Sequence, residues 1–271
     1  MSQDHEPSAP AGSSGLEPGT LLCGVDIGAS ATKLVVIDAA GGLLAKIVRP
    51  SGADYAGTAR ACLDEALSRL PQGSRIARTV ATGHGRRNVA WADDFLTEIH
   101  CHAIGCYHLV RRACTIVDIG GQDNKVIHVD TDGKRTSFKM NRKCAAGTGA
   151  FLEEIAVRLN LPMGELDGLA ASATAAAQLS SFCTVFAKTE ILTHLRMGAA
   201  VESIVRGAFL SMATRVVEMD PLDGLVVLTG GVAEHNPVFA TILREKLGRE
   251  VIVPPDPQHT GALGAALLAR T

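Results

Sequence analysis

The 271-residue sequence predicts an α/β fold made of two related lobes. The first observation is an internal repeat: Val-Asp-Ile-Gly, followed by a lysine and an aspartate at fixed offsets, occurs at 25–38 and again at 117–130. The second is that β-rich runs alternate with stretches of helical periodicity. The third is an apolar content of 46%, which is enough to build one large core or two medium ones.

The first copy of the repeat begins a predicted series of strands and one helix. Two β-rich runs in Leu21–Asp38 flank a turn of small residues, and a third strand is expected over Leu43–Val48. Apolar residues at helical spacing in Tyr55–Leu70 predict a helix, which the proline and glycine after it should end. Ile76–Thr82 is then predicted to be a fourth strand.

The chain divides into a tail and two lobes in this interpretation. Residues 1–20 are rich in Ser, Pro, Gly and Ala and lack the apolar run of a signal peptide, so we expect a disordered tail. Lobe I is predicted over residues 21–115. It is completed by a C-terminal helix within 257–271, whose Gly-x-x-Gly spacing allows close packing against a neighbour. Lobe II is predicted over residues 116–256.

Each copy of the repeat predicts a strand–turn–strand whose tip lets phosphate approach the backbone. Asp26 and Asp118 stand near the end of the first strand of each hairpin, where a carboxylate can hold a metal ion through water or orient an attacking water. A single Asp-x-Gly hairpin would be weak support, since both are ordinary turn residues, but two matched copies are stronger. The predicted phosphate-binding residues are Ala29, Ser30 and Lys33, with the backbone N–H groups of Gly28, Gly120 and Gly121.

Two other glycine turns stand beside apolar segments. An apolar strand that starts at Leu225 runs into a Thr-Gly-Gly turn, against which a flat ring or a ribose could lie. Alone, this turn would be interpreted as a tight strand-to-helix connection. Cys144 stands three residues before a Gly-Thr-Gly turn that opens an amphipathic helix, and a helix N-terminus attracts anions. The residues predicted to bind a cofactor in the two turns are Gly147, Thr148, Gly149, Thr229, Gly230 and Gly231.

Charge and composition exclude several classes of function. With 26 basic and 28 acidic residues, the sequence lacks the basic surplus of a nucleic-acid-binding protein. Aromatic residues make up only 4%, which leaves few platforms for stacking bases. No apolar run approaches the roughly 18 to 20 residues of a membrane span. Seven cysteines without an export signal predict reduced thiols and a cytoplasmic protein.

Most of the cysteines are predicted to be small core residues, because cysteine is among the most buried residue types. This applies to Cys23, Cys62 and Cys114. A metal site is conceivable from a second set of residues by ligand type alone, but their spacing matches no strong zinc signature, so a packed helix of lobe I is preferred. That second set is Cys101, His102, Cys106 and His108.

The two hairpins, the Thr-Gly-Gly turn and the glycine-rich helices together resemble the nucleotide-binding core shared by actin, sugar kinases and the Hsp70 ATPase. Within that superfamily, the sequence resembles the ATP-dependent activators (component A) of 2-hydroxyacyl-CoA dehydratases and the ATPase subunits of benzoyl-CoA reductases, the BadF/BadG/BcrA/BcrD type. Sugar kinases have the hairpins without the two cysteine blocks. The blocks that carry the resemblance are Ala81–Arg86, Cys101–Ala103, Val117–Asp123, Lys143–Gly149, Cys183–Ala187 and Thr229–Ala233.

The resemblance implies an ATP-hydrolysing one-electron donor that activates a partner 2-hydroxyacyl-CoA dehydratase or a related low-potential reductase. It also implies ATP or ADP with Mg²⁺ between the lobes, and a homodimer with one [4Fe-4S] cluster on its two-fold axis. Such a cluster takes four thiolates, and the matching ligands here are Cys144 and Cys183 from each chain. A ferredoxin or flavodoxin is the expected source of electrons.

The predicted catalytic residues are Asp26, Asp118 and Gln122. One aspartate is expected to help hold Mg²⁺, and Asp118 with Gln122 is favoured for orienting the attacking water. We also expect a mechanical link between the two sites, because Cys144 and the Gly-Thr-Gly turn belong to one short segment. ATP should therefore expose the cluster and ADP should bury it.

Three alternatives stay open. An ATPase subunit of a benzoyl-CoA reductase would carry the same motifs, since the sequence does not specify the acceptor enzyme. A small-molecule kinase of the amino-sugar type would need a sugar pocket and no cluster, so iron content would exclude it. A nucleotide-gated assembly protein with a structural cluster would show no ATP-dependent electron transfer.

Overall fold

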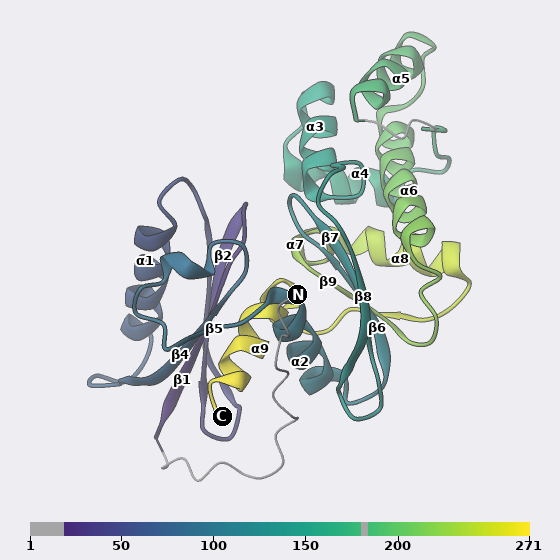
Figure 1. Cartoon of the computed structure of the whole chain (residues 1–271). Helices are drawn as coiled ribbons and strands as arrows, with labels where there is room; N and C mark the ends of the chain where they lie inside the picture. Colours follow the sequence, from purple (N-terminus) through teal and green to yellow (C-terminus); the bar gives the residue numbers. More distant parts are fainter. Residues whose placement is uncertain (1–18, 180–183) are drawn as a thin grey trace, which may run out of the picture.

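The computed structural model describes residues 19–179 and 184–271. The predicted tail lies almost entirely outside the described residues, and so does Cys183. The described chain forms two five-stranded sheets with helices on their faces (Figure 1), which confirms the predicted α/β fold. Within this part of the chain, no helix is long and apolar enough to cross a membrane.

The first sheet contains the first copy of the repeat. Its strand order is β3-β2-β1-β4-β5, with β1 antiparallel to β2 and parallel to β4. β1 is buried along its whole length, as expected of a continuous apolar run with helices on both faces of its sheet. The strands are β1 (Leu21–Ile27), β2 (Ala31–Asp38), β3 (Leu43–Pro50), β4 (Ile76–Thr82) and β5 (Asp94–Phe95).

The second sheet repeats this design. Its order is β10-β9-β6-β7-β8, which matches the first sheet when it is followed from β8. In both copies the aspartate of the hairpin pairs with its lysine, Asp26 with Lys33 and Asp118 with Lys125. The predicted internal duplication is therefore confirmed. The strands are β6 (Cys114–Ile119), β7 (Asn124–Val129), β8 (Arg135–Asn141), β9 (Val226–Thr229) and β10 (Val251–Ile252).

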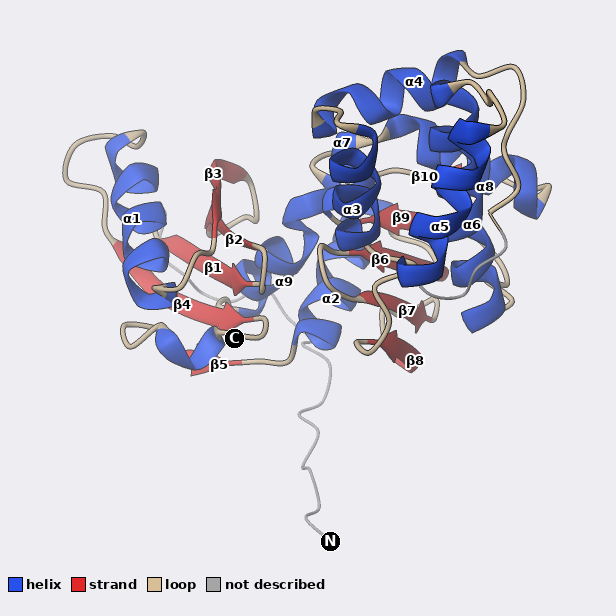
Figure 2. Cartoon of the chain, turned by 90° about the horizontal axis from the view of Figure 1, so that it is seen from above, coloured by secondary structure: helices blue, strands red, loops and turns tan. Residues whose placement is uncertain are grey.

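The helices form three layers around the two sheets (Figures 1 and 2). α1 packs on one face of the first sheet and α9 on the other, because alternate residues of β1 such as Leu22 and Cys23 point to opposite sides. α2 packs against α9 and the second sheet, whose far face is covered by the remaining large helices. The helices are α1 (Tyr55–Ser68), α2 (Glu98–Val110), α3 (Gly149–Leu159), α4 (Leu166–Ser172), α5 (Thr184–Arg196), α6 (Val201–Met219), α7 (Gly231–His235), α8 (Pro237–Leu247) and α9 (Thr260–Leu268), with single 3₁₀ turns η1 (Arg86–Asn88), η2 (Met163–Glu165) and η3 (Pro257–His259).

Two glycines allow α2 and α9 to cross in direct backbone contact. A Cβ at Gly264 would overlap the carbonyl oxygen of Cys101, and a Cβ at Gly105 would overlap that of Thr260. The close packing expected of the C-terminal helix is therefore confirmed, with α2 as the neighbour. This crossing lies between the inner faces of the two sheets, so it helps set the distance between the sheets.

We predict that Gly264→Ala destabilises the protein by about 1–3 kcal/mol, because the new methyl group must push α2 and α9 apart. Urea unfolding of the variant and the wild type measures this difference. Gly168→Ala is the matched control, since Gly168 lies in α4 with open space around its Cα and should gain about 0.5–1 kcal/mol. Equal stability of Gly264→Ala and the wild type would contradict the close crossing.

Candidate functional site

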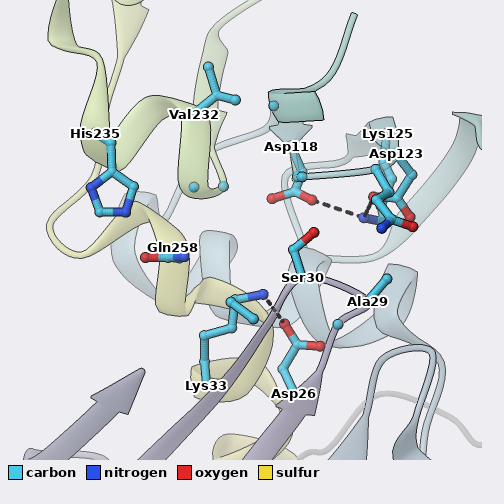
Figure 3. Close-up of a pocket in the computed structure, with 18 of the residues that line it drawn as sticks. Asp26, Ala29, Ser30, Lys33, Asp118, Asp123, Lys125, Val232, His235 and Gln258 are labelled. Atoms are coloured by element: carbon cyan, nitrogen blue, oxygen red, sulfur yellow. Dashed lines mark hydrogen bonds and ion pairs between the residues drawn. The ribbon is translucent and has the colours of Figure 1, made fainter. Parts of the chain in front are cut away.

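A cleft of about 410 Å³ lies between the two sheets, where both repeat hairpins turn. This volume is typical of a small-molecule site. Figure 3 shows side chains of both hairpins directed into the cleft, with residues of α7 on the opposite side. The predicted residues that line it are Asp26, Gly28, Ala29, Ser30, Lys33, Asp118, Gly120, Gly121, Gln122, Gly149, Gly230 and Gly231.

Three other predicted residues lie behind the wall of the cleft and support groups that face it. The buried hydroxyl of Thr229 donates to Asp118 Oδ1 at 3.0 Å. Thr148 is also buried and directly precedes α3. The carbonyl of Gly147 accepts a hydrogen bond from Asn124 Nδ2 at 3.1 Å.

The two hairpin tips meet at Ser30 and Gly121. A Cβ at Gly121 would overlap Ser30 Oγ, so only glycine fits opposite the first hairpin. The turns are tight, because the N–H of Gly28 donates to Ala31 O at 3.1 Å and the N–H of Gly120 donates to Asp123 O at 2.9 Å. Each of these two N–H groups therefore closes its own turn, and their contact with phosphate stays a prediction.

The first hairpin carries a partly exposed ion pair. Lys33 Nζ lies 3.3 Å from Asp26 Oδ2, and the side chain of Lys33 is 16% exposed. Only this one carboxylate contacts the ammonium group among the ion pairs found in the described chain. An ammonium has three donors, so Lys33 can also reach an anion in the cleft.

The second hairpin carries a buried cluster of charges. Lys125 Nζ lies 2.7 Å from Asp123, 3.1 Å from Asp118 and 3.9 Å from Glu98. Burial alone would lower the pKa of Lys125, but these three carboxylates hold that pKa well above its usual range. Lys125 therefore stays charged and neutralises acidic side chains at the floor of the cleft.

Asp118 is held rigidly and kept ionised. Thr229 donates to its Oδ1 and Lys125 to its Oδ2, while His102 Nδ1 lies 3.7 Å from Oδ1. Burial alone would raise the pKa of Asp118, but His102 and Lys125 hold that pKa well below its usual range. A carboxylate with so low a pKa is a weak general base. It is better suited to orienting water or a hydrated cation.

The opposite side of the cleft is formed by the Thr-Gly-Gly turn and the segment before α9. Gly230 has a φ of +93°, and a Cβ there would overlap the backbone of Ile119, so the turn requires glycine. His235 and Gln258 line this side (Figure 3). The turn leaves backbone and small side chains facing the cleft, as the ring- or ribose-binding prediction requires.

The segment that contains Cys144 is hydrogen-bonded to the second hairpin. The N–H groups of Gly149 and Ala150, at the start of α3, donate to the carbonyls of Gly120 and Gly121 at 2.9 and 2.7 Å. These two N–H groups of the helix N-terminus therefore bind the second hairpin, and the anion predicted at this helix start stays a prediction. Together with the Asn124–Gly147 bond, these contacts make the Gly120–Gly121 turn and the loop before α3 one connected unit.

The described cysteines differ sharply in exposure. Cys144 is exposed in a loop that follows two basic residues, whereas Cys23, Cys62, Cys101, Cys106 and Cys114 are buried. Burial raises the pKa of Cys23 and Cys101 to about 12, and those of Cys62 and Cys114 to about 11. These five are inert core thiols, which confirms the prediction for Cys23, Cys62 and Cys114.

The packed-helix interpretation of the Cys101 segment is confirmed. Cys101 packs in the core beside α9, while Cys106 packs in the core beneath the second sheet. His102 bonds Thr260 at 3.1 Å and contacts Asp118, so its role is at the cleft. Across residues 19–179 and 184–271, no three His, Cys, Asp or Glu side chains are grouped to hold a metal ion.

Sequence reasoning missed several residues of the cleft. Lys125 belongs to the repeat, and its equivalence to Lys33 is the signal that could have placed it in the site. His102 stands in a block that carries the family resemblance. Its only predicted role is that of a possible metal ligand, which does not place it in the cleft. Asp123 ends the Val117–Asp123 block, although nothing in that block singles it out. Other missed residues come together only in the fold, among them Glu98, Arg142, His235, Asn236 and Gln258.

We predict that Lys125→Met destabilises the protein by about 3–5 kcal/mol at pH 7, because Asp118 stays buried without its partner. The depressed pKa of Asp118 stabilises the wild type above the unfolded-state value of about 4, and this contribution is lost as pH falls toward the folded-state value. In the variant that pKa rises and the folded state takes up a proton. The deficit should therefore shrink as pH falls from about 7 to about 4.

Urea unfolding at three pH values within this range measures the deficit. Lys134→Met removes an exposed lysine on the β7–β8 turn and should change stability by less than about 0.5 kcal/mol. A deficit that stays constant over the whole range would contradict the assignment of Asp118 as the charge that Lys125 compensates.

Two dehydratase activators are similar to this chain over most of its length. The activator of lactoyl-CoA dehydratase from Anaerotignum propionicum is 44% identical over 251 residues, which cover 91% of this chain and 96% of that protein. The activator of the 2-hydroxyisocaproyl-CoA dehydratase from Clostridium difficile, solved with bound ADPNP, matches with a TM-score of 0.85 at 36% identity, covering 93% of this chain and 94% of that one.

A more distant relative is one of the subunits of the benzoyl-CoA reductase from Thauera aromatica, 29% identical over 261 residues that cover 92% of both chains. The model of one protein family matches residues 23–269, which include both sheets, the cleft and the Cys144 loop. The chain therefore belongs to the BadF/BadG/BcrA/BcrD ATPase family.

Proposed function

We propose that this protein is an ATP-hydrolysing one-electron donor that activates a partner 2-hydroxyacyl-CoA dehydratase or a related low-potential reductase. One observation carries the proposal. The hairpin at the floor of the cleft is hydrogen-bonded to the segment that contains the exposed Cys144, so a nucleotide site and a thiolate share one structural unit. The full-length similarity to dehydratase activators supports this function over a kinase.

The cleft supplies what phosphate transfer to water needs. The Lys33 ammonium can pair with phosphate oxygens, and Ser30 stands beside it at the meeting point of the two hairpins. Both hairpin aspartates line the cleft, so Asp26 would hold Mg²⁺ through water, and the ionised Asp118, with Gln122, would orient the attacking water. The base and ribose would lie on the Thr229–Gly231 side.

The cysteine chemistry fits an iron–sulfur cluster shared by two chains. Such a cluster would supply one-electron transfer at low potential. Cys144 is exposed, unlike the other described cysteines, and the basic residues Arg142 and Lys143 directly precede it, which suits an anionic cluster. With Cys183, one chain offers two ligands, so a homodimer completes a set of four.

Nucleotide and thiolate are coupled through the backbone. Any displacement of the Gly120–Gly121 turn must move the start of α3, because two hydrogen bonds of 2.7 and 2.9 Å join them. The γ-phosphate is the group that differs between ATP and ADP, and the hairpins are where it would bind. We infer that ATP and ADP hold Cys144 in different positions and so regulate docking of the acceptor enzyme.

The partners follow from this proposal. The chain would act as a homodimer in the cytoplasm, take electrons from a ferredoxin or a flavodoxin, and pass them to an acceptor enzyme. A role as an ATPase subunit of a benzoyl-CoA reductase stays the alternative within the family. The deciding experiment is anaerobic electron transfer to candidate acceptors with ATP, with ADP and without nucleotide. Transfer that does not depend on ATP would overturn the proposal.

We predict that Asp118→Ala lowers the kcat of ATP hydrolysis by about 10²-fold or more, the usual scale for losing a positioned catalytic group. Steady-state phosphate release measures this, with Asp118→Asn as the nearly isosteric variant and a thermal melt to show folding. Asp132→Ala, at an exposed aspartate on the β7–β8 turn, should keep the wild-type kcat. Full activity in a folded Asp118→Asn variant would contradict the role of Asp118.

We predict about four irons per two chains after anaerobic purification, and their loss in both Cys144→Ser and Cys183→Ser. Iron content and the mass of the native species are the measurements. Cys62→Ser is the control, because Cys62 is buried under the first sheet and should not affect iron. Full iron content in Cys183→Ser would remove that residue from the ligand set.

A further inference from the structure

A second hollow, of about 760 Å³, lies outside the cleft on the edge of the second sheet. Its walls come from the edge strand β8, the start of α2, the η1 turn and the loop that leads to Cys144. Figure 2 shows β8 at the outer edge of its sheet, with no strand beyond it in the described chain. We call this hollow the β8 groove. Its charged and aromatic residues are Arg86, Glu98, Arg135, Phe138, Arg142 and Lys143.

The β8 groove is strongly basic in a chain whose net charge is −2. Four Arg or Lys side chains line it against one carboxylate, Glu98, which is 15% exposed and already paired with Arg142 at 2.8 Å. The local sequence shows the same bias, because residues 133–152 hold five Lys or Arg and no Asp or Glu. Charge of one sign gathered in a concave surface attracts a partner of opposite charge.

The groove also presents an exposed aromatic anchor. The Phe138 side chain is 48% exposed, and the Arg135 guanidinium lies 5.4 Å from the centre of its ring. Aromatic residues and arginine are both enriched at protein interfaces. An inorganic anion would make little use of an exposed aromatic ring, and the chain as a whole lacks the basic surplus of a nucleic-acid-binding protein, so the groove fits a protein.

We propose that the β8 groove is the docking surface for an acidic, electron-carrying protein that delivers electrons to this chain. The inference rests on the proposed function, because it takes Cys144 as a cluster ligand. Lys143 lines the groove and is directly followed by Cys144, so a carrier seated there lies beside the redox centre. Transient electron-transfer complexes have small interfaces, and opposite charges on the two partners guide their association. A small basic groove suits such a complex.

The electron source fits the groove better than the acceptor enzyme. A homodimer would carry two copies of the groove, one on each chain. The acceptor would meet the shared cluster on the two-fold axis and should respond to the nucleotide. The groove walls on β8, α2 and η1 do not include the hairpin turns that would sense the nucleotide, although the wall formed by the loop before Cys144 is joined to those turns.

The test uses the full chain, purified anaerobically, and a flavodoxin as the acidic probe. Arg135→Glu should slow flavodoxin association by about 10-fold or more at low ionic strength, with the effect vanishing at high salt. Arg135→Lys should keep most of the wild-type rate, and Phe138→Ser should raise the dissociation rate without slowing association. Lys246→Glu on α8, which packs beside β10 at the opposite edge of the sheet, should have no effect.

Comparing reduction by flavodoxin with reduction by dithionite tests the docking groove separately from the electron-donor function, because dithionite needs no docking surface. Arg135→Glu should be reduced slowly by flavodoxin but normally by dithionite, with unchanged ATP hydrolysis. Failure of dithionite to reduce even the wild type would refute the electron-donor function, while the binding rates would still report on the groove. Equal association rates for Arg135→Glu and wild type overturn the proposal, as does a loss confined to binding of the acceptor enzyme or of DNA.

Discussion

The buried ion pair between Asp118 and Lys125 is the interaction on which the rest of the site depends. Both side chains are almost fully removed from water, and each would be unstable there without the other. Their positions are fixed by strand register, since the two residues face each other across β6 and β7. The pair thereby fixes an ionised carboxylate at the floor of the cleft before any ligand arrives.

Duplication explains why the site lies between the sheets, and divergence of the two copies explains its chemistry. Each copy places an Asp–Lys pair near the tip of a hairpin. In the first copy Lys33 is partly exposed and has one carboxylate, so it can reach an incoming anion. In the second copy three carboxylates surround the ammonium group of Lys125 and neutralise its charge. The repeated motif thus provides a partly exposed lysine on one side of the cleft and a fixed carboxylate on the other.

Much of this could be predicted from the sequence, because the repeat has a fixed register. Matching offsets of aspartate and lysine predict two hairpins, and the hairpin geometry follows from strand pairing alone. The hydrogen bonds by which the N–H groups of Gly28 and Gly120 close their own turns could not be predicted, since a sequence does not show whether a turn closes on itself. Residues such as Glu98 and Gln258 enter the cleft from distant segments with no local signal, so only tertiary packing identifies them.

The charge of the cleft constrains how a nucleotide can enter. Five carboxylates line it against three Lys or Arg side chains, and Lys125 is already neutralised by its neighbours. Polyphosphate is itself strongly anionic, so the walls alone would repel it at short range. A divalent cation bound between phosphate and the hairpin carboxylates reverses this repulsion, because it is attracted to both. Under the proposed function, the same excess of acid would therefore favour the Mg²⁺ complex of ATP over free ATP.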